Sequence, residues 1–95
     1  MSSRLIFYRK NVGADGDIVE MKIWEVSRAR KTPEGLKYSL VYVRGGKRLI
    51  GYDNAEGKGH HRHMGNVEAL YSFEDVDRLI GDFLADVEKI RRGDT

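Results

Sequence analysis

The chain has no cysteine and only one proline among its 95 residues. Without cysteine there is no disulfide framework and no thiolate metal site, which favours an intracellular protein. No apolar run approaches the length needed to span a bilayer, and the apolar stretch at residues 5–8 is too short for the core of a signal peptide. We therefore expect a cytoplasmic protein that does not act at membranes.

Charge of neither sign dominates the composition. Charged residues make up 34% and hydrophobic residues 40% of the sequence, a balance typical of globular proteins. The length suits one domain with a single core, so we expect residues 1–95 to fold together. The net charge of +2 permits a polyanionic partner without requiring one.

Alternation of apolar and polar residues in the first half of the chain predicts antiparallel strands with one solvated face. Four segments are expected to form strands: residues 5–9, 18–26, 36–44 and 47–52. Within the second segment, Trp24 and Val26 fall out of phase, which indicates a bulge or burial on both faces. Gly45-Gly46 predicts a two-residue hairpin turn that needs positive φ angles. Residues 67–71 could add a short fifth strand.

The last third of the chain predicts one helix. Ser72 stands three residues before Asp75, the spacing of a capping box, so we expect the helix to begin at Ser72. Apolar residues recur at helical spacing from Val76 to Ile90, and this stripe can be buried only against the sheet. The predicted fold class is α+β: an antiparallel four- to five-stranded sheet (a β-meander) packed by one C-terminal helix.

Several aromatic and basic residues have more than one interpretation. Five aromatic residues fall on the expected strands: Tyr8, Trp24, Tyr38, Tyr42 and Tyr52. Rings on a sheet can stack RNA bases, but packing in the core or across strands is the more common role, and we favour it here. The basic loop at residues 28–31 could contact a nucleic-acid backbone or simply be solvated.

The segment whose side chains best suit a chemical reaction is residues 51–65, Gly-Tyr-Asp-Asn-Ala-Glu-Gly-Lys-Gly-His-His-Arg-His-Met-Gly. It holds all three histidines of the chain. Loops of about a dozen residues in compact domains are usually functional or disordered. Glycines would let the backbone approach a substrate closely. Imidazoles, carboxylates and cations in one segment suit proton transfer or phosphate binding.

Cleavage of an RNA backbone fits the segment without any cofactor. The reaction needs a base for the 2′-hydroxyl group, an acid for the leaving 5′-oxygen and cations near the phosphate. Imidazole titrates near neutral pH and can serve as base or acid, and lysine and arginine can stabilise phosphate charge. The candidate catalytic residues are His61, His63, Lys58 and Arg62. Candidates for substrate binding or for orienting an imidazole are Asp53, Asn54, Glu56 and His60.

Three other interpretations stay open. His61 and His63 would point the same way in an extended segment, and Asp53 or Glu56 could complete a metal site; the spacing matches no established signature, and we assign no metal. The segment could be a solvated loop. It could also belong to a module that binds nucleic acid or a protein partner without catalysis.

The order of several segments along the chain is recognisable. It begins with the strand segments at residues 18–24 and 36–54, continues with Gly57-Lys58-Gly59 and His61-Arg62-His63, and ends with the helical segment at 82–87. This order resembles the TumE family of small toxins from prokaryotic toxin–antitoxin pairs. The resemblance spans nearly the whole chain, and its most specific part runs from Gly51 to His63. One departure is visible, because His60 stands where the family pattern has an acidic residue.

The resemblance implies an intracellular, growth-inhibiting toxin. It also implies a cognate antitoxin, often a DNA-binding protein of helix-turn-helix type, that sequesters the toxin. RNA as the substrate rests on the residues above and on analogy with other small toxins. A homodimer is a further expectation, because an edge strand at residues 5–9 could pair across a two-fold axis.

Overall fold

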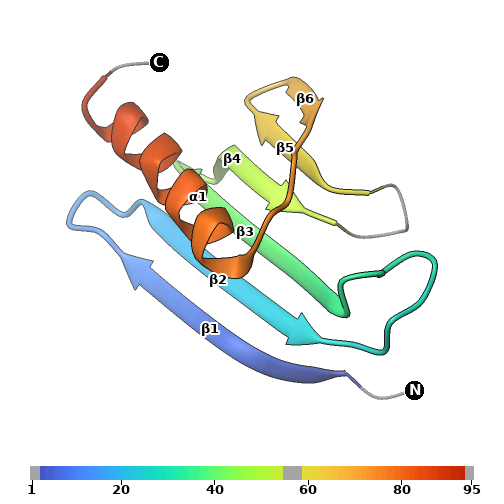
Figure 1. The fold of residues 1–95 in the computed structure, drawn as a ribbon. Helices are drawn as coiled ribbons and strands as arrows, with labels where there is room; N and C mark the ends of the chain where they lie inside the picture. The colour runs from blue at the N-terminus through green and yellow to red at the C-terminus, as the bar shows by residue number, and fades with distance from the viewer. Residues whose placement is uncertain (1–2, 55–58, 94–95) are drawn as a thin grey trace.

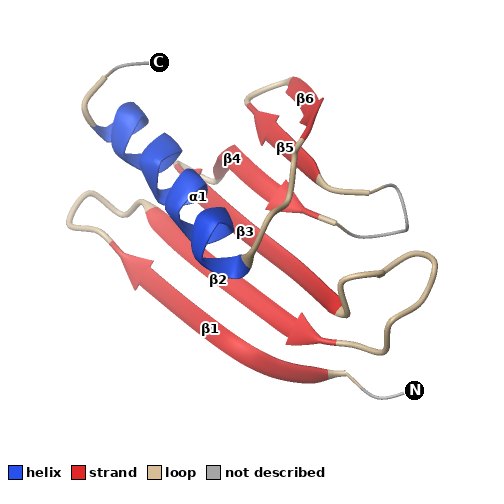
Figure 2. Cartoon of the chain, viewed as in Figure 1, coloured by secondary structure: helices blue, strands red, loops and turns tan. Residues whose placement is uncertain are grey.

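The structure is a computed structural model that describes residues 3–54 and 59–93. These residues form six strands and one helix (Figures 1 and 2). The elements are β1 (Arg4–Val12), β2 (Ile18–Glu25), β3 (Leu36–Arg44), β4 (Lys47–Asp53), β5 (His61–Met64), β6 (Val67–Leu70) and α1 (Val76–Arg91). Every strand pairs antiparallel with its neighbour in the order β1-β2-β3-β4-β5-β6. The α+β meander with one C-terminal helix is thus confirmed.

The sheet has one strand more than the sequence predicted, and that strand is β5. Its four residues pair with β4 and β6. The sequence pattern could not reveal it, because its four residues are almost all polar and show no alternation with apolar ones. Seven of the fifteen residues from Gly51 to Gly65 therefore lie in strands, at 51–53 and 61–64.

One face of the sheet carries the core, and α1 lies across that face (Figure 1). Alternate side chains of β2, β3 and β4 point inward as predicted. The buried apolar residues are Val19, Met21, Ile23, Tyr38, Leu40, Tyr42, Ile50, Tyr52, Leu79, Phe83 and Val87. The interpretation of Tyr38, Tyr42 and Tyr52 as core residues is confirmed. Tyr8 and Trp24 instead lie on the opposite, helix-free face.

The irregularity expected near Trp24 lies in β1 and not in β2. The pairing of β1 with β2 shifts between Leu5 and Phe7, opposite Trp24 and Ile23, so Ile6 is the additional residue. β2 is paired on both sides, whereas β1 is an edge strand and can hold an extra residue with less loss of hydrogen bonds. The Gly45-Gly46 turn is as predicted, with φ angles of 59° and 74°.

A buried carboxylate ties the C-terminal end of α1 to the sheet. Asp17, just before β2, accepts a hydrogen bond of 2.6 Å from the Tyr42 hydroxyl group, and its Oδ2 lies 3.3 Å from Nε of Arg91. The hydrogen bond from Tyr42, followed by one with Asp15 and a smaller contribution from Arg91, lowers the pKa of Asp17 to about 2. Among the residues described, no helix is long and apolar enough to cross a bilayer.

The prediction that Ser72 begins the helix is wrong. The N-cap is Asp75, whose Oδ1 accepts the backbone N–H of Arg78 at 2.8 Å, and the helix starts at Val76. Phe73 explains the delay, because its ring stacks on that of His60 with 4.8 Å between the centroids. This contact keeps residues 72–74 outside the helix, where Ser72 cannot act as its cap.

Substitution of Asp75 and of Ser72 tests which residue caps α1. Asp75→Ala should destabilise the fold by about 1 kcal/mol, because the first turn of α1 loses its side-chain acceptor. Ser72→Ala should change the free energy of unfolding by less than about 0.5 kcal/mol. Urea denaturation of both variants measures the difference. A larger loss for Ser72→Ala than for Asp75→Ala would contradict the assignment.

Candidate functional site

Strand β5 divides the polar segment between the two faces of the sheet. Side chains alternate along a strand, so His61 and His63 share the helix-free face while Arg62 points toward α1. The cross-strand partners agree with this division: Asp53 lies opposite His61, and Tyr52, a core residue, lies opposite Arg62. The four candidate catalytic residues therefore do not all meet in one place.

On the helix-free face, two imidazoles and two carboxylates come together. Nδ1 of His61 lies 3.2 Å from Oε2 of Glu68, and Nε2 of His63 lies 3.4 Å from Oδ2 of Asp53. The same His63 nitrogen lies 3.8 Å from Glu68. The two imidazole side chains are 15% and 20% exposed, so both are held in place and still accessible. Each ring has a carboxylate that can orient it and stabilise the charge it gains as a base.

A guanidinium group completes this cluster. Gly51 lies directly opposite His63 in the register of β4 and β5. Arg48 fills the space that a side chain on Gly51 would take: its Cδ, Nε and Cζ atoms lie 3.2 Å from the position of a Cβ atom there. The Arg48 side chain thus lies over Gly51, the residue that pairs with His63, and its planar fork can receive a phosphate there.

Sequence reasoning did not identify Arg48 or Glu68. Glu68 reaches the histidines because β6 pairs with β5 and places it opposite His63. That pairing depends on recognising β5 as a strand. For Arg48 the available signal was Gly51, since a glycine within a strand often marks a close approach by another group.

His60 is not part of the cluster. Its Nε2 lies 2.8 Å from Oε2 of Glu34, its Nδ1 lies 2.9 Å from the Tyr38 hydroxyl oxygen, and its ring stacks on Phe73. A neutral ring protonated at Nε2 satisfies both hydrogen bonds. Burial alone would raise the pKa of Glu34, but hydrogen bonds from His60 and from the Glu34 backbone lower it below its usual value. His60 thus links the connection before β5 to the loop between β2 and β3.

Asn54 likewise makes structural bonds. Its Oδ1 accepts the backbone N–H of Tyr38 at 2.9 Å, and its Nδ2 donates to the carbonyl of Leu36 at 2.8 Å. Asn54 is buried, so these two bonds hold the end of β4 against the start of β3. Lys58 and Glu56, the remaining candidates, lie outside the described residues. In the part of the chain that the structure describes, no group of three or more His, Asp or Glu side chains is arranged to hold a metal ion.

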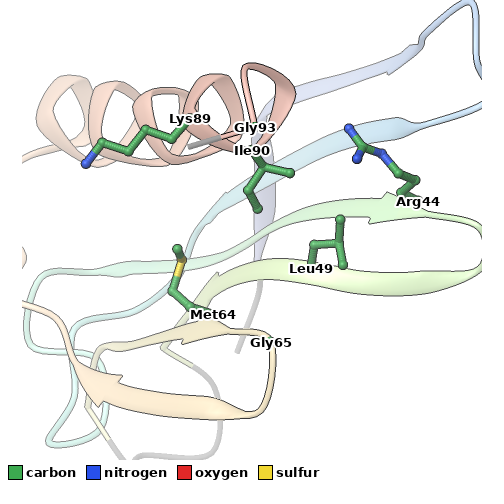
Figure 3. Close-up of a pocket in the computed structure, with 7 residues that line it drawn as sticks. All are labelled: Arg44, Leu49, Met64, Gly65, Lys89, Ile90 and Gly93. Atoms are coloured by element: carbon green, nitrogen blue, oxygen red, sulfur yellow. The ribbon is translucent and has the colours of Figure 1, made fainter. Parts of the chain in front are cut away.

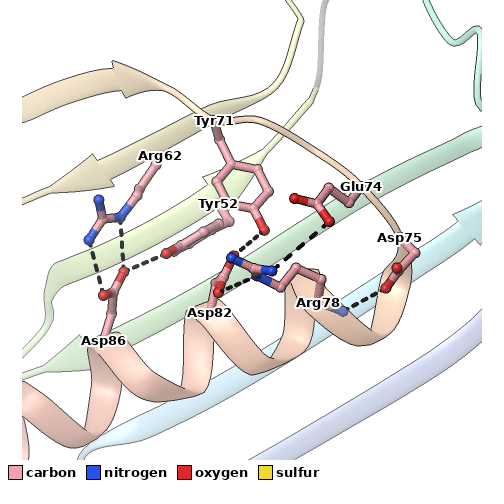
Figure 4. A network of polar contacts seen from close by, with 8 residues as sticks. All are labelled: Tyr52, Arg62, Tyr71, Glu74, Asp75, Arg78, Asp82 and Asp86. Carbon is pink, nitrogen blue, oxygen red and sulfur yellow. Dashed lines mark hydrogen bonds and ion pairs between the residues drawn. The ribbon is translucent and has the colours of Figure 1, made fainter.

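Arg62 belongs to a network on the helix side of the sheet (Figure 4). It makes a two-pronged ion pair with the buried Asp86 of α1, with Nε–Oδ2 at 2.9 Å and Nη2–Oδ1 at 3.0 Å. The Tyr52 hydroxyl group donates to the same carboxylate. Burial, followed by this hydrogen bond, raises the pKa of Tyr52. Nearby, Tyr71 donates to Asp82 at 2.6 Å, so both connections join the sheet to α1.

A pocket lies between α1 and the ends of β4 and β5 (Figure 3). This pocket of about 560 Å³ has an apolar floor of Leu49, Met64 and Ile90, with Arg44 and Lys89 among its other lining residues. Met64 follows His63 on β5 but lies opposite Ile50, on the core face. The pocket is therefore on the other side of the sheet from the two histidines, and its lining offers no acid–base pair.

Comparison with protein families now adds to the geometry. The family model described as Toxin TumE matches residues 2–91, nearly the whole chain. The chain belongs to the TumE toxin family. Searches of curated proteins and of solved structures find no match. As a member of the TumE family, the protein is a toxin of a toxin–antitoxin system, which implies a cognate antitoxin as its partner.

The contact between Arg62 and Asp86 predicts an effect on stability. Asp86→Ala should cost about 2 kcal/mol, because it leaves the Arg62 guanidinium and the Tyr52 hydroxyl group without their acceptor in a partly buried setting. Arg62→Ala in the Asp86→Ala background should cost less than Arg62→Ala alone. A double-mutant cycle by urea denaturation measures this coupling, expected at about 1 kcal/mol. A coupling near zero would contradict the structural role.

Proposed function

We propose that this toxin is an endoribonuclease that cleaves RNA by acid–base catalysis without a metal ion, with His61 and His63 as the acid–base pair. The observation that carries the proposal is their common face: two accessible imidazoles on one strand, each against a carboxylate, beside a guanidinium. General acid–base catalysis of phosphodiester cleavage needs two proton-transfer groups and a cation in one place.

The spacing of the two rings suits the reaction. Residues two apart on a strand have Cα atoms about 7 Å apart, so two imidazoles can contact opposite sides of one phosphate. One neutral ring takes the proton of the 2′-hydroxyl group, and the 2′-oxygen attacks phosphorus. The other ring, protonated, gives its proton to the 5′-oxygen as the P–O5′ bond breaks. The products are a 2′,3′-cyclic phosphate and a free 5′-hydroxyl group.

The other groups of the cluster support these steps. Asp53 and Glu68 orient the rings and stabilise the imidazolium that forms during the reaction. Arg48 stabilises the extra negative charge on the pentacoordinate phosphorus. Arg62, in contrast, is held by Asp86 on the other face, and we assign it the task of positioning β5. Lys58 stays a candidate for phosphate binding.

Two expectations about partners also stay proposals. The antitoxin would be a DNA-binding protein of helix-turn-helix type, as the family resemblance implies. A homodimer would form through β1, an edge strand whose Leu5, Ile6 and Val12 are 49%, 46% and 64% exposed. Strand pairing across an exposed edge is the physical basis of that second proposal.

Substitution of the two histidines tests the reaction. His61→Ala and His63→Ala should each lower kcat by about 100- to 10,000-fold, and the wild-type rate should pass through a maximum with pH because one ring must be neutral and the other protonated. Cleavage of a fluorogenic RNA in the presence of a chelator measures both effects. A substrate with a single 2′-deoxy nucleotide at the cleaved position should stay intact, since its nucleophile is missing.

Lys89→Ala, on α1, is the control and should leave the rate unchanged. Growth arrest on induced expression provides an independent readout in cells. A His61→Ala, His63→Ala double variant that cleaves RNA at the wild-type rate would refute the proposal.

The space above Gly51 generates a separate prediction. Gly51→Ala places a Cβ atom against the Arg48 side chain and should displace its guanidinium, lowering kcat by roughly 10- to 100-fold. Arg48→Ala should have a similar effect. Thermal denaturation should show little loss of stability in either variant, because Arg48 is partly solvated. Gly81→Ala is the matched control, since a Cβ atom there meets nothing within 4 Å; equal activity losses at positions 51 and 81 would contradict the role of Arg48.

A further inference from the structure

The helix-free face extends well beyond the histidine cluster. A single row of cross-strand partners runs from His61 through Asp53, Ser39 and Lys22 to Tyr8 on β1. Neighbouring strands lie about 4.8 Å apart, so Lys22 is about 14 Å from His61 along this row. A polymer whose phosphate lies at the histidines can therefore continue over the next three strands.

The adjacent row places an aromatic ring beside a second cation. Lys37 on β3 lies opposite Trp24 on β2, and its Nζ is 5.9 Å from the centroid of the indole ring. Trp24 is the one tryptophan of the chain, and it is partly exposed and outside the core. An accessible indole next to an exposed lysine is the combination that single-stranded nucleic-acid platforms use.

The charges of this face suit a polyanion. Away from the histidine cluster and Arg48, its cations are Lys10, Lys22 and Lys37. The neighbouring carboxylate of Glu20 accepts a hydrogen bond of 3.0 Å from the Tyr8 hydroxyl group. Large exposed apolar side chains of the sheet lie on its two edge strands and not in its middle. Within the described residues, α1 packs against the opposite face (Figure 1), so this one is open.

We propose that the helix-free face binds single-stranded RNA, with Trp24 stacking an unpaired base and Lys22 and Lys37 contacting phosphates beside the scissile bond at His61 and His63. The identity of the substrate as RNA rests on the proposed function. The single-stranded state follows from geometry: a base can lie flat on an indole in a sheet only when it is not paired in a duplex. When RNA binds, the exposed Lys37 ammonium group gives up its contact with the indole ring and contacts a phosphate oxygen instead.

Fluorescence of the single tryptophan tests the stacking directly. A His61→Ala, His63→Ala variant, which leaves RNA intact, is titrated with a ten-nucleotide oligoadenylate and with a duplex RNA of the same length. The oligoadenylate should quench the fluorescence in a saturable way and bind at least tenfold more tightly than the duplex. Anisotropy of a labelled oligoadenylate should give the same dissociation constant.

Variants then assign the contacts. In the same background, Trp24→Leu should weaken binding roughly tenfold, whereas Trp24→Phe retains a stacking surface and should weaken it less. Lys22→Gln and Lys37→Gln should each reduce the slope of log affinity against log salt by about 0.7. Lys89→Gln, on the helix side, is the control and should change neither quantity. Circular dichroism verifies that each variant is folded, and Trp24→Phe supplies the test if Trp24→Leu is not.

The outcomes separate this inference from the proposed reaction. Absence of quenching, equal affinity for the duplex, or normal binding by Trp24→Leu would overturn the RNA surface even if the wild-type protein cleaves RNA. Quenching by a purified antitoxin but not by RNA would assign the face to a protein partner and would also overturn it. If RNA stacks on Trp24 but the wild-type protein never cleaves RNA, the proposed binding surface stands and the proposed nuclease activity is refuted.

Discussion

The arrangement of the candidate site depends on one ion pair on the other side of the sheet. Side chains of a strand alternate, so fixing Arg62 toward α1 fixes His61 and His63 away from it. The two-pronged contact with Asp86 and the hydrogen bond from Tyr52 provide that fixation. A shift of β5 by one residue would bury both imidazoles against the helix and expose the guanidinium. The chemistry on one face is therefore set by packing on the other.

The same pair illustrates why a buried charge can be retained without large net stabilisation. Removing a carboxylate from water is costly, and the attraction to its partner often only offsets that cost. Asp86 is 5% exposed, while the Arg62 side chain is 37% exposed, so solvent also weakens the attraction. β5 has only four residues, and of these only Met64 is apolar. A charged contact can specify its register, whereas hydrophobic burial alone would specify it weakly.

Much of the fold was predictable because β2, β3 and the apolar stripe of α1 follow simple periodicities. The start of α1 was not, because the contact between Phe73 and His60 keeps Ser72 outside the helix although Ser72 has the capping-box spacing to Asp75. β5 was not predictable, because polar residues lie on both of its faces and it shows no hydrophobic alternation. The sequence could name His61, His63 and Asp53 as candidates, but separating His60 and Arg62 from them required the pairing of β4 with β5. Glu68 became visible only through the register of β5 and β6, and Arg48 only through the space above Gly51.

The division into two faces has a consequence for how the molecule can work. On the core face, Tyr38, Tyr52 and Asn54 make bonds that hold strands and helix together. On the helix-free face, the histidines, Arg48 and Trp24 are partly exposed and contribute little to the core. In the proposed function, RNA that approaches this face meets a surface whose geometry is already fixed by the sheet, so its binding requires little ordering of the protein. Catalytic groups on a rigid strand also hold their spacing better than groups on a loop. Forming a strand therefore fixes the spacing of the polar side chains in this segment. A free loop of the same composition would not hold them in that arrangement.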